Sequence, residues 1–302
     1  MTDTQKTDVI IIGGSYAGLS AGMALGRALR KVLIIDGGEP CNRQTPHSHN
    51  FITQDGQTPK AISTLARNQV EKYETVQFYE GLAVQVNRTN QGFDVETKTG
   101  ELFTAKKLIL ASGIKDLLPP IEGFAACWGI SVIHCPYCHG YEVRNEKTAV
   151  LTNGELGYDF SKMISNWTKD LILFTNGPST FTEEQNLKLK KKGIGIIETE
   201  IDKFVHHNGQ LEQVIFKDGS KIPLKVLYAK LPFTQQAGPS LQAGCELTEQ
   251  GYIKTDGFQK TTIPGLYACG DNTWPMRSVS NAVAEGTLTG AMVNRELIEE
   301  EF

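Results

Sequence analysis

The chain has 302 residues, of which 40% are hydrophobic and 21% are charged. This length suits two domains of about 150 residues, each able to bury a core of its own. The formal net charge of −4 arises from 34 acidic and 30 basic residues without a strongly basic block, which argues against a nucleic-acid-binding protein. We therefore expect small molecules and proteins as partners.

The N-terminal segment is polar from Met1 to Asp8, and the apolar run Val9 to Ile12 is too short for a signal peptide or a membrane span. We therefore expect a cytoplasmic protein with no membrane partner. Its six cysteines are irregularly spaced, which does not indicate a disulfide framework. In a reducing compartment, the one Cys-x-x-Cys pair, Cys135 and Cys138, indicates redox chemistry or a metal site.

The first structural pattern is a βαβ unit. The β-branched run Val9 to Ile12 is typical of a strand buried on both faces, and it stops at a pair of glycines. Residues Ser15 to Leu29 have helical spacing, and Lys31 to Asp36 predicts a second strand that ends on an acid.

The same pattern recurs in the middle third of the chain, which predicts a second nucleotide-type domain. Its expected parts are a strand at Thr148 to Leu151, a glycine-bearing turn at Thr152 to Gly157, a helix at Tyr158 to Trp167 and a strand at Asp170 to Thr175. A long helix is expected from about Asn281 to Glu300. The chain is expected to cross between the domains near Leu117 to Gly123 and Leu231 to Gly238.

The loop after the first strand predicts a dinucleotide site. A fingerprint of this kind needs glycines, because side chains would keep the pyrophosphate away from the helix N-terminus. The candidate residues are Gly13, Gly14, Ser15, Tyr16, Ala17 and Gly18, in which Ser15 replaces the second glycine of the fingerprint. A glycine turn without a ligand is the alternative. Asp36 argues against it, because an acid there can accept hydrogen bonds from an adenosine ribose.

Two further strand-to-turn segments indicate that this dinucleotide is FAD. Lys107 to Gly113 and Tyr267 to Asp271 resemble signatures of the two-dinucleotide-binding flavoproteins. The resemblance implies that the first turn lets the backbone approach the flavin nucleotide and that the second lies by the ribityl-pyrophosphate portion. The residues it assigns to the cofactor are Ala111, Ser112, Gly113, Gly270 and Asp271, with Asn50, Asn281 and Ala282 on the isoalloxazine side.

The order of these motifs and of the Cys135–Cys138 pair resembles the low-molecular-weight thioredoxin reductase family along nearly the whole chain. This resemblance implies an α/β fold of two nested dinucleotide-binding domains, the second inserted in the first. Residues 1–116 and 240–302 would form the discontinuous FAD-binding domain, and residues 117–239 would form an inserted nicotinamide-type domain that carries the Cys-x-x-Cys. It also implies a homodimer.

The cysteine pair is predicted to be a redox-active dithiol. A first cysteine at a helix N-terminus has a favoured thiolate, and Pro136 is well tolerated in a first helical turn. Zinc is the competing interpretation, but the other cysteines are isolated, so we expect no metal. By resemblance to thioredoxin reductases, Cys138 would face the flavin and Cys135 would exchange with the external sulfur compound.

His139 stands where that family commonly has aspartate. An imidazole with a pKa of about 6.5 can accept and donate a proton near neutral pH, so His139 is a candidate acid or base, and a packing role is the alternative. His134, His47 and His49 are weaker candidates. The Cys-x-x-Cys-His pattern also resembles dithiol oxidases of disulfide natural products, which pass electrons to oxygen.

The second glycine loop departs from the family pattern. Glu155 would repel a pyrophosphate, and the strand ends in Phe174, Thr175, Asn176 and Gly177 where the family has arginines. We therefore expect NAD(P)H to bind weakly or not at all.

The predicted function is an FAD-dependent, thioredoxin reductase-like disulfide oxidoreductase acting on a small dithiol or disulfide or on a thioredoxin-like protein. The alternatives are a dithiol oxidase with oxygen as acceptor, a ferredoxin-linked reductase and, from another class, a catalytically silent flavin-binding protein.

Overall fold

The computed structural model describes residues 6–302, with the backbone alone for Pro239 and Ser240, so the first five residues of the polar N-terminal segment lie outside the described residues. The chain divides into two compact units. Unit 1 contains the residues up to Arg43, Asn50–Lys115 and Phe233–Phe302, and unit 2 contains Gln44–His49 and Asp116–Pro232. Within residues 6–302, no helix is both long enough and apolar enough to span a membrane.

Unit 1 is built on a seven-stranded sheet in the order β3-β2-β1-β6-β5-β4, with β17 also paired to β6. Strands β1, β2, β3, β6 and β17 pair in parallel, whereas β4 and β5 form an antiparallel extension. The strands are β1 (Lys6–Ile12), β2 (Val32–Asp36), β3 (Val76–Glu80), β4 (Ala83–Thr89), β5 (Gly92–Thr97), β6 (Leu102–Leu110) and β17 (Leu266–Ala268).

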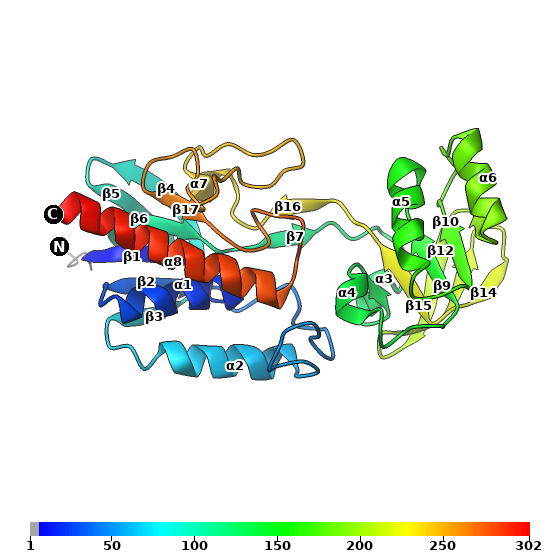
Figure 1. Cartoon of the computed structure of the whole chain (residues 1–302), viewed down its shortest axis with the longest axis horizontal. Coiled ribbons are helices and arrows are strands. Elements are labelled where there is room, and N and C mark those ends of the chain that lie inside the picture. The colour runs from blue at the N-terminus through cyan, green and yellow to red at the C-terminus, as the bar shows by residue number, and fades with distance from the viewer. Residues whose placement is uncertain (1–5) are drawn as a thin grey trace. The chain divides into compact units, whose positions relative to one another are not determined.

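The helices of unit 1 are α1 (Tyr16–Arg27), α2 (Pro59–Val70), α7 (Pro239–Gln242) and α8 (Val279–Glu301). Helices α1 and α8 lie side by side on one face of the sheet (Figure 1). Their backbones approach closely, because a Cβ atom on Gly286 would lie 2.2 Å from the carbonyl oxygen of Ala17. Glycine at this position therefore allows the two helices to pack without a clash.

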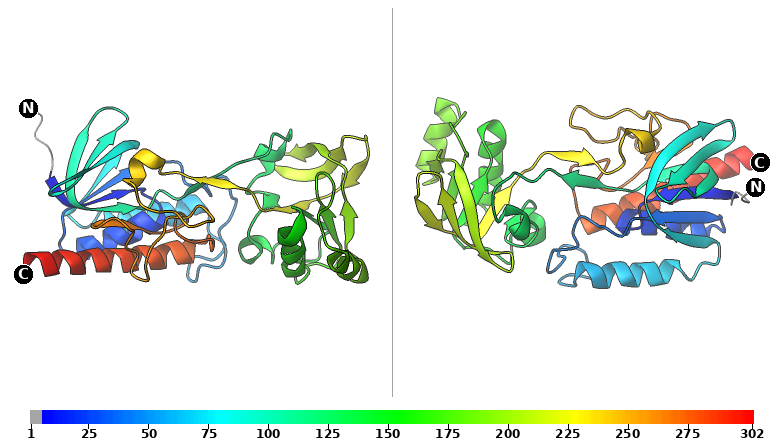
Figure 2. Two further views of the ribbon diagram at one scale, coloured as in Figure 1. Left: turned by 90° about the horizontal axis from the view of Figure 1, so that it is seen from above. Right: turned by 180° about the vertical axis from the view of Figure 1, so that it is seen from behind.

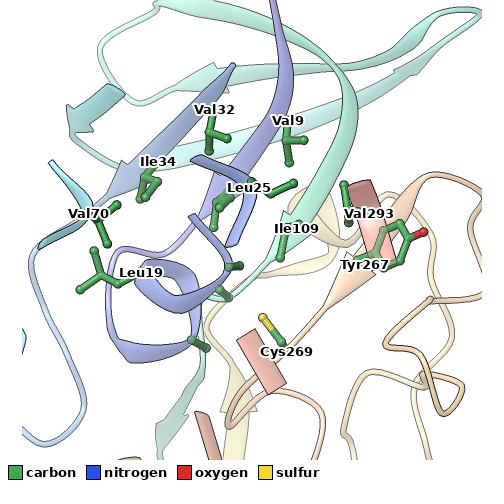
Figure 3. Close-up of a cluster of buried hydrophobic side chains, with 14 of the residues drawn as sticks. Val9, Leu19, Leu25, Val32, Ile34, Val70, Ile109, Tyr267, Cys269 and Val293 are labelled. Carbon is green, nitrogen blue, oxygen red and sulfur yellow. The ribbon is translucent and has the colours of Figure 1, made fainter. Parts of the chain in front are cut away.

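The alternation of side chains along β1 divides the core of unit 1 between the two faces of the sheet. Val9 and Ile11 belong to the cluster on the α1 and α8 side, where Figure 3 shows Val9, Ile109 and Tyr267 among the buried side chains. Ile10 and Ile12 belong to the cluster on the opposite face. This double burial explains why the part of the strand from Val9 to Ile12 contains no polar residue.

Unit 2 contains a parallel five-stranded sheet in the order β11-β10-β9-β15-β8 and an antiparallel sheet β12-β13-β14. The larger sheet has α5 and α6 on one face and the antiparallel sheet on the other (Figure 2). The strands are β8 (Val132–Ile133), β9 (Thr148–Leu151), β10 (Leu171–Phe174), β11 (Gly195–Ile197), β12 (Ile201–His207), β13 (Gln210–Phe216), β14 (Lys221–Pro223) and β15 (Val226–Ala229). The helices are α3 (Phe124–Cys127), α4 (Pro136–His139), α5 (Gly154–Ile164) and α6 (Glu183–Lys191).

The two predicted βαβ patterns are present as β1-α1-β2 and β9-α5-β10. The prediction for α5 was wrong at its start, because the helix begins at Gly154 inside the segment expected to be a turn. The side chain of Asn153 accepts a hydrogen bond from the Gly154 N–H and so allows the earlier start. The chain leaves unit 1 along β7 (Ile114–Asp116) and returns along β16 (Phe233–Gln235), and these two strands pair.

A buried charge cluster joins α8 to the sheet of unit 1. Lys107 on β6 is buried, and its Nζ lies 2.6 Å from Glu296 Oε1 and 2.5 Å from Glu300 Oε1. Glu296 Oε2 also accepts hydrogen bonds from Tyr267 and Lys260. Burial alone would raise the pKa of Glu296, but the hydrogen bonds from Lys107, Lys260 and Tyr267 outweigh it and lower the pKa to about 2.

We predict that Glu296→Gln lowers the free energy of unfolding by about 1 to 3 kcal/mol at pH 7, because Lys107 loses part of its counter-charge in a buried place. Since the folded-state pKa of Glu296 lies below its unfolded value, its contribution is present above the unfolded pKa and is lost as the pH falls toward 2. The difference from wild type should therefore shrink below about pH 5. Chemical denaturation across this pH range measures it.

The matched control is Glu299→Gln on the same helix, because Glu299 pairs only with exposed Arg295 among the ion pairs described here. Its effect should stay within about 0.5 kcal/mol. Equal losses from the two substitutions would contradict the assigned role of the buried cluster.

Candidate active site

The predicted glycine loop meets β2 and the turn after β6 at the carboxyl ends of the parallel strands. A Cβ atom on Gly13, whose φ is 112°, would lie 2.3 Å from the carbonyl oxygen of Ala111. A Cβ on Gly14 would lie 2.6 Å from the Asp36 side chain, and one on Gly18 would lie 1.8 Å from the Gly13 carbonyl oxygen. The structure thus brings three separately predicted segments together.

The N-terminus of α1 differs from those of the other helices of at least nine residues in the described chain. Thr58, Asn153, Thr182 and Ser278 cap α2, α5, α6 and α8 with side-chain hydrogen bonds, whereas Ser15 makes no such bond at the start of α1. The nearby Ser112 hydroxyl is buried and has no hydrogen-bond partner within residues 6–302. An uncapped helix N-terminus and an unpaired hydroxyl fit the phosphate oxygens of a dinucleotide.

The turn after β17 is tied to the first turn of α8 by Glu285, a residue that the sequence analysis missed. Its Oε2 accepts hydrogen bonds from the Gly270 N–H at 2.6 Å and from the Thr273 hydroxyl at 2.9 Å. Its Oε1 accepts one from Asn281 Nδ2 at 2.8 Å. The spacing of Asn281 and Glu285 on one helix was the available signal, because residues four apart are neighbours on a helix surface.

Asp271 lies beside two further groups that the sequence analysis did not connect with it. Its Oδ2 lies 3.6 Å from Arg277 Nε and 3.7 Å from the Cys41 sulfur. Burial raises the pKa of Asp271, and the Arg277 charge opposes that shift. Of the other expected residues, Ala282 is buried in the first turns of α8, and Asn50 lies in the loop that joins β2 to α2, where its N–H donates to Asp55.

The cysteine pair forms a disulfide across α4. Cys135 is the N-cap, its sulfur accepts a hydrogen bond from the Cys138 N–H at 3.1 Å, and Pro136 occupies the first turn. Gly140 ends the helix, where a Cβ atom would lie 2.4 Å from the Pro136 carbonyl oxygen. Tyr137, between the two cysteines, is 63% exposed and packs edge-on against Trp167. The pair therefore lies in a short helix whose end does not accommodate a side chain at Gly140.

His139 follows the pair directly and is half-buried. Burial and, to a smaller extent, the nearby His49 lower its pKa, and Glu142 opposes both effects, so that the pKa of His139 is about 4. The imidazole is therefore neutral at pH 7, whereas the sequence analysis expected it to titrate near neutrality. Glu142, which the sequence analysis missed, lies with its Oε1 3.6 Å from His49 Nδ1. All three residues belong to unit 2.

The residues of the second glycine loop make hydrogen bonds with one another and with other residues of unit 2. Asn153 Oδ1 accepts hydrogen bonds from the N–H groups of Gly154 at 2.8 Å and Thr180 at 3.0 Å, and Asn153 Nδ2 donates to the Pro178 carbonyl oxygen at 2.8 Å. Glu155 lies in the first turn of α5 and accepts a hydrogen bond from Gln185 at 2.5 Å. A pyrophosphate at this helix N-terminus would compete with the Asn153 cap and meet the Glu155 carboxylate, so these residues do not fit a nicotinamide dinucleotide.

The side chains of the loop after β10 also make hydrogen bonds within unit 2. The Thr175 hydroxyl donates to the Gly177 carbonyl oxygen at 2.7 Å, and Asn176 Oδ1 accepts a hydrogen bond from the Ile201 N–H at 2.7 Å. Neither residue carries a charge, so this segment offers no cation for a 2′-phosphate and no carboxylate for a ribose.

We predict that alkylation of the native protein labels exposed Cys41 before reduction and labels Cys135 and Cys138 only after mild reduction. The remaining cysteines, Cys127, Cys245 and Cys269, should stay unlabelled in both samples, because burial raises the pKa of each thiol, to about 12 for Cys269. Peptide mass spectrometry measures the labelling. Labelling of Cys135 or Cys138 without reductant would contradict the disulfide.

Known proteins similar to this chain agree with the fold. The profile of the pyridine nucleotide-disulphide oxidoreductase family matches residues 7–286. A thioredoxin reductase of Leptosphaeria maculans is 32% identical, over 95% of this chain and 93% of its own length, and one of Claviceps purpurea is 29% identical, over 99% and 96%.

The crystal structure of an oxidoreductase from Agrobacterium tumefaciens aligns with a TM-score of 0.90 at 38% identity, over 97% of this chain and 99% of that one. The predicted α/β fold with two dinucleotide-binding domains is thereby confirmed. The chain belongs to the pyridine nucleotide-disulphide oxidoreductase family, as a thioredoxin reductase-like enzyme of the flavoprotein type.

Proposed function

We propose that this enzyme is an FAD-dependent thiol–disulfide oxidoreductase that exchanges electrons between the Cys135–Cys138 pair and an external dithiol or disulfide, without ordinary use of NADPH. The observation that carries the proposal is the disulfide across α4 with His139 directly after it. In a chain of this family, that arrangement supports a catalytic dithiol over a silent flavin-binding protein.

Unit 1 is the proposed FAD-binding part. The uncapped N-terminus of α1 would hold the pyrophosphate, Asp36 would hold the adenosine ribose, and Asp271 would lie by the ribityl portion. The other proposed cofactor residues are Gly13, Ser15, Ala17, Gly18, Asn50, Ala111, Ser112, Gly113, Gly270, Asn281 and Ala282. When bound, FAD supplies a two-electron acceptor or donor for the dithiol.

The exchange itself needs only the cysteine pair and the external thiols. One substrate thiolate attacks the Cys135 sulfur, the bond between the two cysteines breaks, and Cys138 leaves as a thiolate with the electron pair. The second substrate thiolate then attacks the substrate sulfur of the mixed disulfide and releases Cys135 as a thiolate. The substrate is oxidised to a disulfide, the pair is reduced, and two protons leave the substrate thiols.

His139 is the proposed proton acceptor for this step. Its imidazole is neutral at pH 7, since burial, reinforced by His49, lowers its pKa to about 4, and it adjoins the leaving Cys138 in the chain. A neutral imidazole has a free lone pair for a thiol proton. In the reverse direction, an imidazolium would return that proton to a leaving thiolate.

The hydrogen bonds within the second glycine loop support an electron donor other than NADPH. Asn153 caps the helix N-terminus at which a pyrophosphate would bind, and Glu155 adds a carboxylate there, so a dithiol is the proposed electron donor. This observation also favours a second candidate function, a dithiol oxidase that passes the electrons on to oxygen. The relatives named thioredoxin reductase support a thioredoxin-like protein as the exchange partner in the first candidate.

We predict that Cys138→Ser slows reduction of the bound flavin by dithiothreitol at least about 100-fold, because the electron pair can no longer pass through the dithiol. Anaerobic stopped-flow absorbance measures the rate. Cys245→Ala is the control, because Cys245 is a buried core residue outside the disulfide, and it should keep the wild-type rate. Flavin reduction in the Cys138→Ser protein at the wild-type rate would contradict the proposal.

A further inference from the structure

A carboxylate–imidazole pair lies next to the helix that carries the disulfide. His49 Nδ1 is 3.6 Å from Glu142 Oε1, and the two side chains are 19% and 40% exposed. His49 comes from the short segment Gln44–His49, which belongs to unit 2 although the chain on both sides of it belongs to unit 1. The fold therefore brings a distant histidine to the residues that follow the cysteine pair.

Glu142 follows His139 closely in the chain, and its charge acts on the His139 imidazole. Helix α4 ends at His139, and the chain continues in turns through Glu142, which is three residues further along. Burial, and then the charge of Glu142, also raises the pKa of the Tyr228 hydroxyl on β15. The Tyr228 side chain is 1% exposed, and its hydroxyl has no hydrogen-bond partner within residues 6–302.

When His139 takes a proton from a thiol, its imidazole becomes positively charged and needs a nearby negative charge to stabilise it. A thiol has an ordinary pKa of about 8.5, so a buried imidazole takes its proton only at a large cost in free energy. Within residues 6–302, the charges that shift the pKa of His139 are those of His49 and Glu142. Cys135 and Cys138 are joined in the disulfide and do not titrate. Of these groups, Glu142 is the one that stabilises an imidazolium.

We propose that Glu142, held in place by His49, is a positioning residue that provides the counter-charge when His139 takes the proton of an incoming thiol. The inference rests on the proposed function and adds the group that makes its proton transfer feasible. The proton moves from the substrate sulfur to the imidazole, and the sulfur keeps its electron pair and attacks Cys135. The bond between Cys135 and Cys138 breaks, and Cys138 takes the leaving electron pair.

The test follows oxidised dithiothreitol formed by the anaerobic holoenzyme in a single turnover, measured by rapid quench from pH 6.5 to 9.5. Glu142→Gln should slow this step about tenfold near pH 7, the effect of about one pKa unit on the base. Near pH 9.5 the rate should approach wild type, because dithiothreitol then ionises without help. Glu142→Asp should recover part of the rate.

Glu146→Gln is the matched control, because Glu146 is an acid four residues further along whose side chain pairs at 3.8 Å with exposed Lys225. It should match wild type at every pH. A Glu142→Gln rate equal to wild type at pH 7, or reduced by the same factor at every pH, would overturn the inference. If wild type forms no oxidised dithiothreitol at all, the proposed function fails and the inference fails with it.

Discussion

The arrangement of unit 1 depends on the close approach of the glycine loop to its neighbours. Gly13 and Gly18 lie so near backbone carbonyl oxygens that a Cβ atom on either would clash, and Gly14 packs against the Asp36 side chain. This packing holds the start of α1 at the carboxyl ends of β1, β2 and β6. Because Ser15 does not cap the helix, its first turn keeps donors for an anionic ligand.

The corresponding helix of unit 2 has the opposite character. Asn153 caps α5 and also joins it to the loop at Thr180, while Glu155 adds a carboxylate to the first turn. The two helix N-termini of the same βαβ architecture therefore differ: α1 has no side-chain cap, and α5 is capped by its own chain. This difference is the physical basis of the proposal that electrons come from thiols in place of a nicotinamide.

Local chemistry made much of this predictable from the sequence. The apolar strand at Val9 to Ile12, the glycines after it and the acid at Asp36 each carry a short-range signal, and together they identified the first βαβ unit. The proximity of Cys135 and Cys138 likewise follows from their spacing. In each case the information lies within a few residues of the feature that it specifies.

The features that sequence analysis missed depend on contacts between distant segments. The early start of α5 uses a cap that Thr180 helps to hold, and the Glu285 contacts join α8 to the turn after β17. The lowered pKa of His139 arises first from burial and then from His49, a residue placed beside it only by the fold. Neither burial nor such neighbours can be read from a local pattern.

The most direct test of the central claim is a parallel anaerobic titration of the flavin spectrum with dithiothreitol, NADPH and NADH. Dithiothreitol should bleach the flavin absorbance, and the disulfide across α4 should open as it does so. Neither NADPH nor NADH should bleach it on the same timescale. Rapid bleaching by NADPH, with no response to dithiothreitol, would contradict the account.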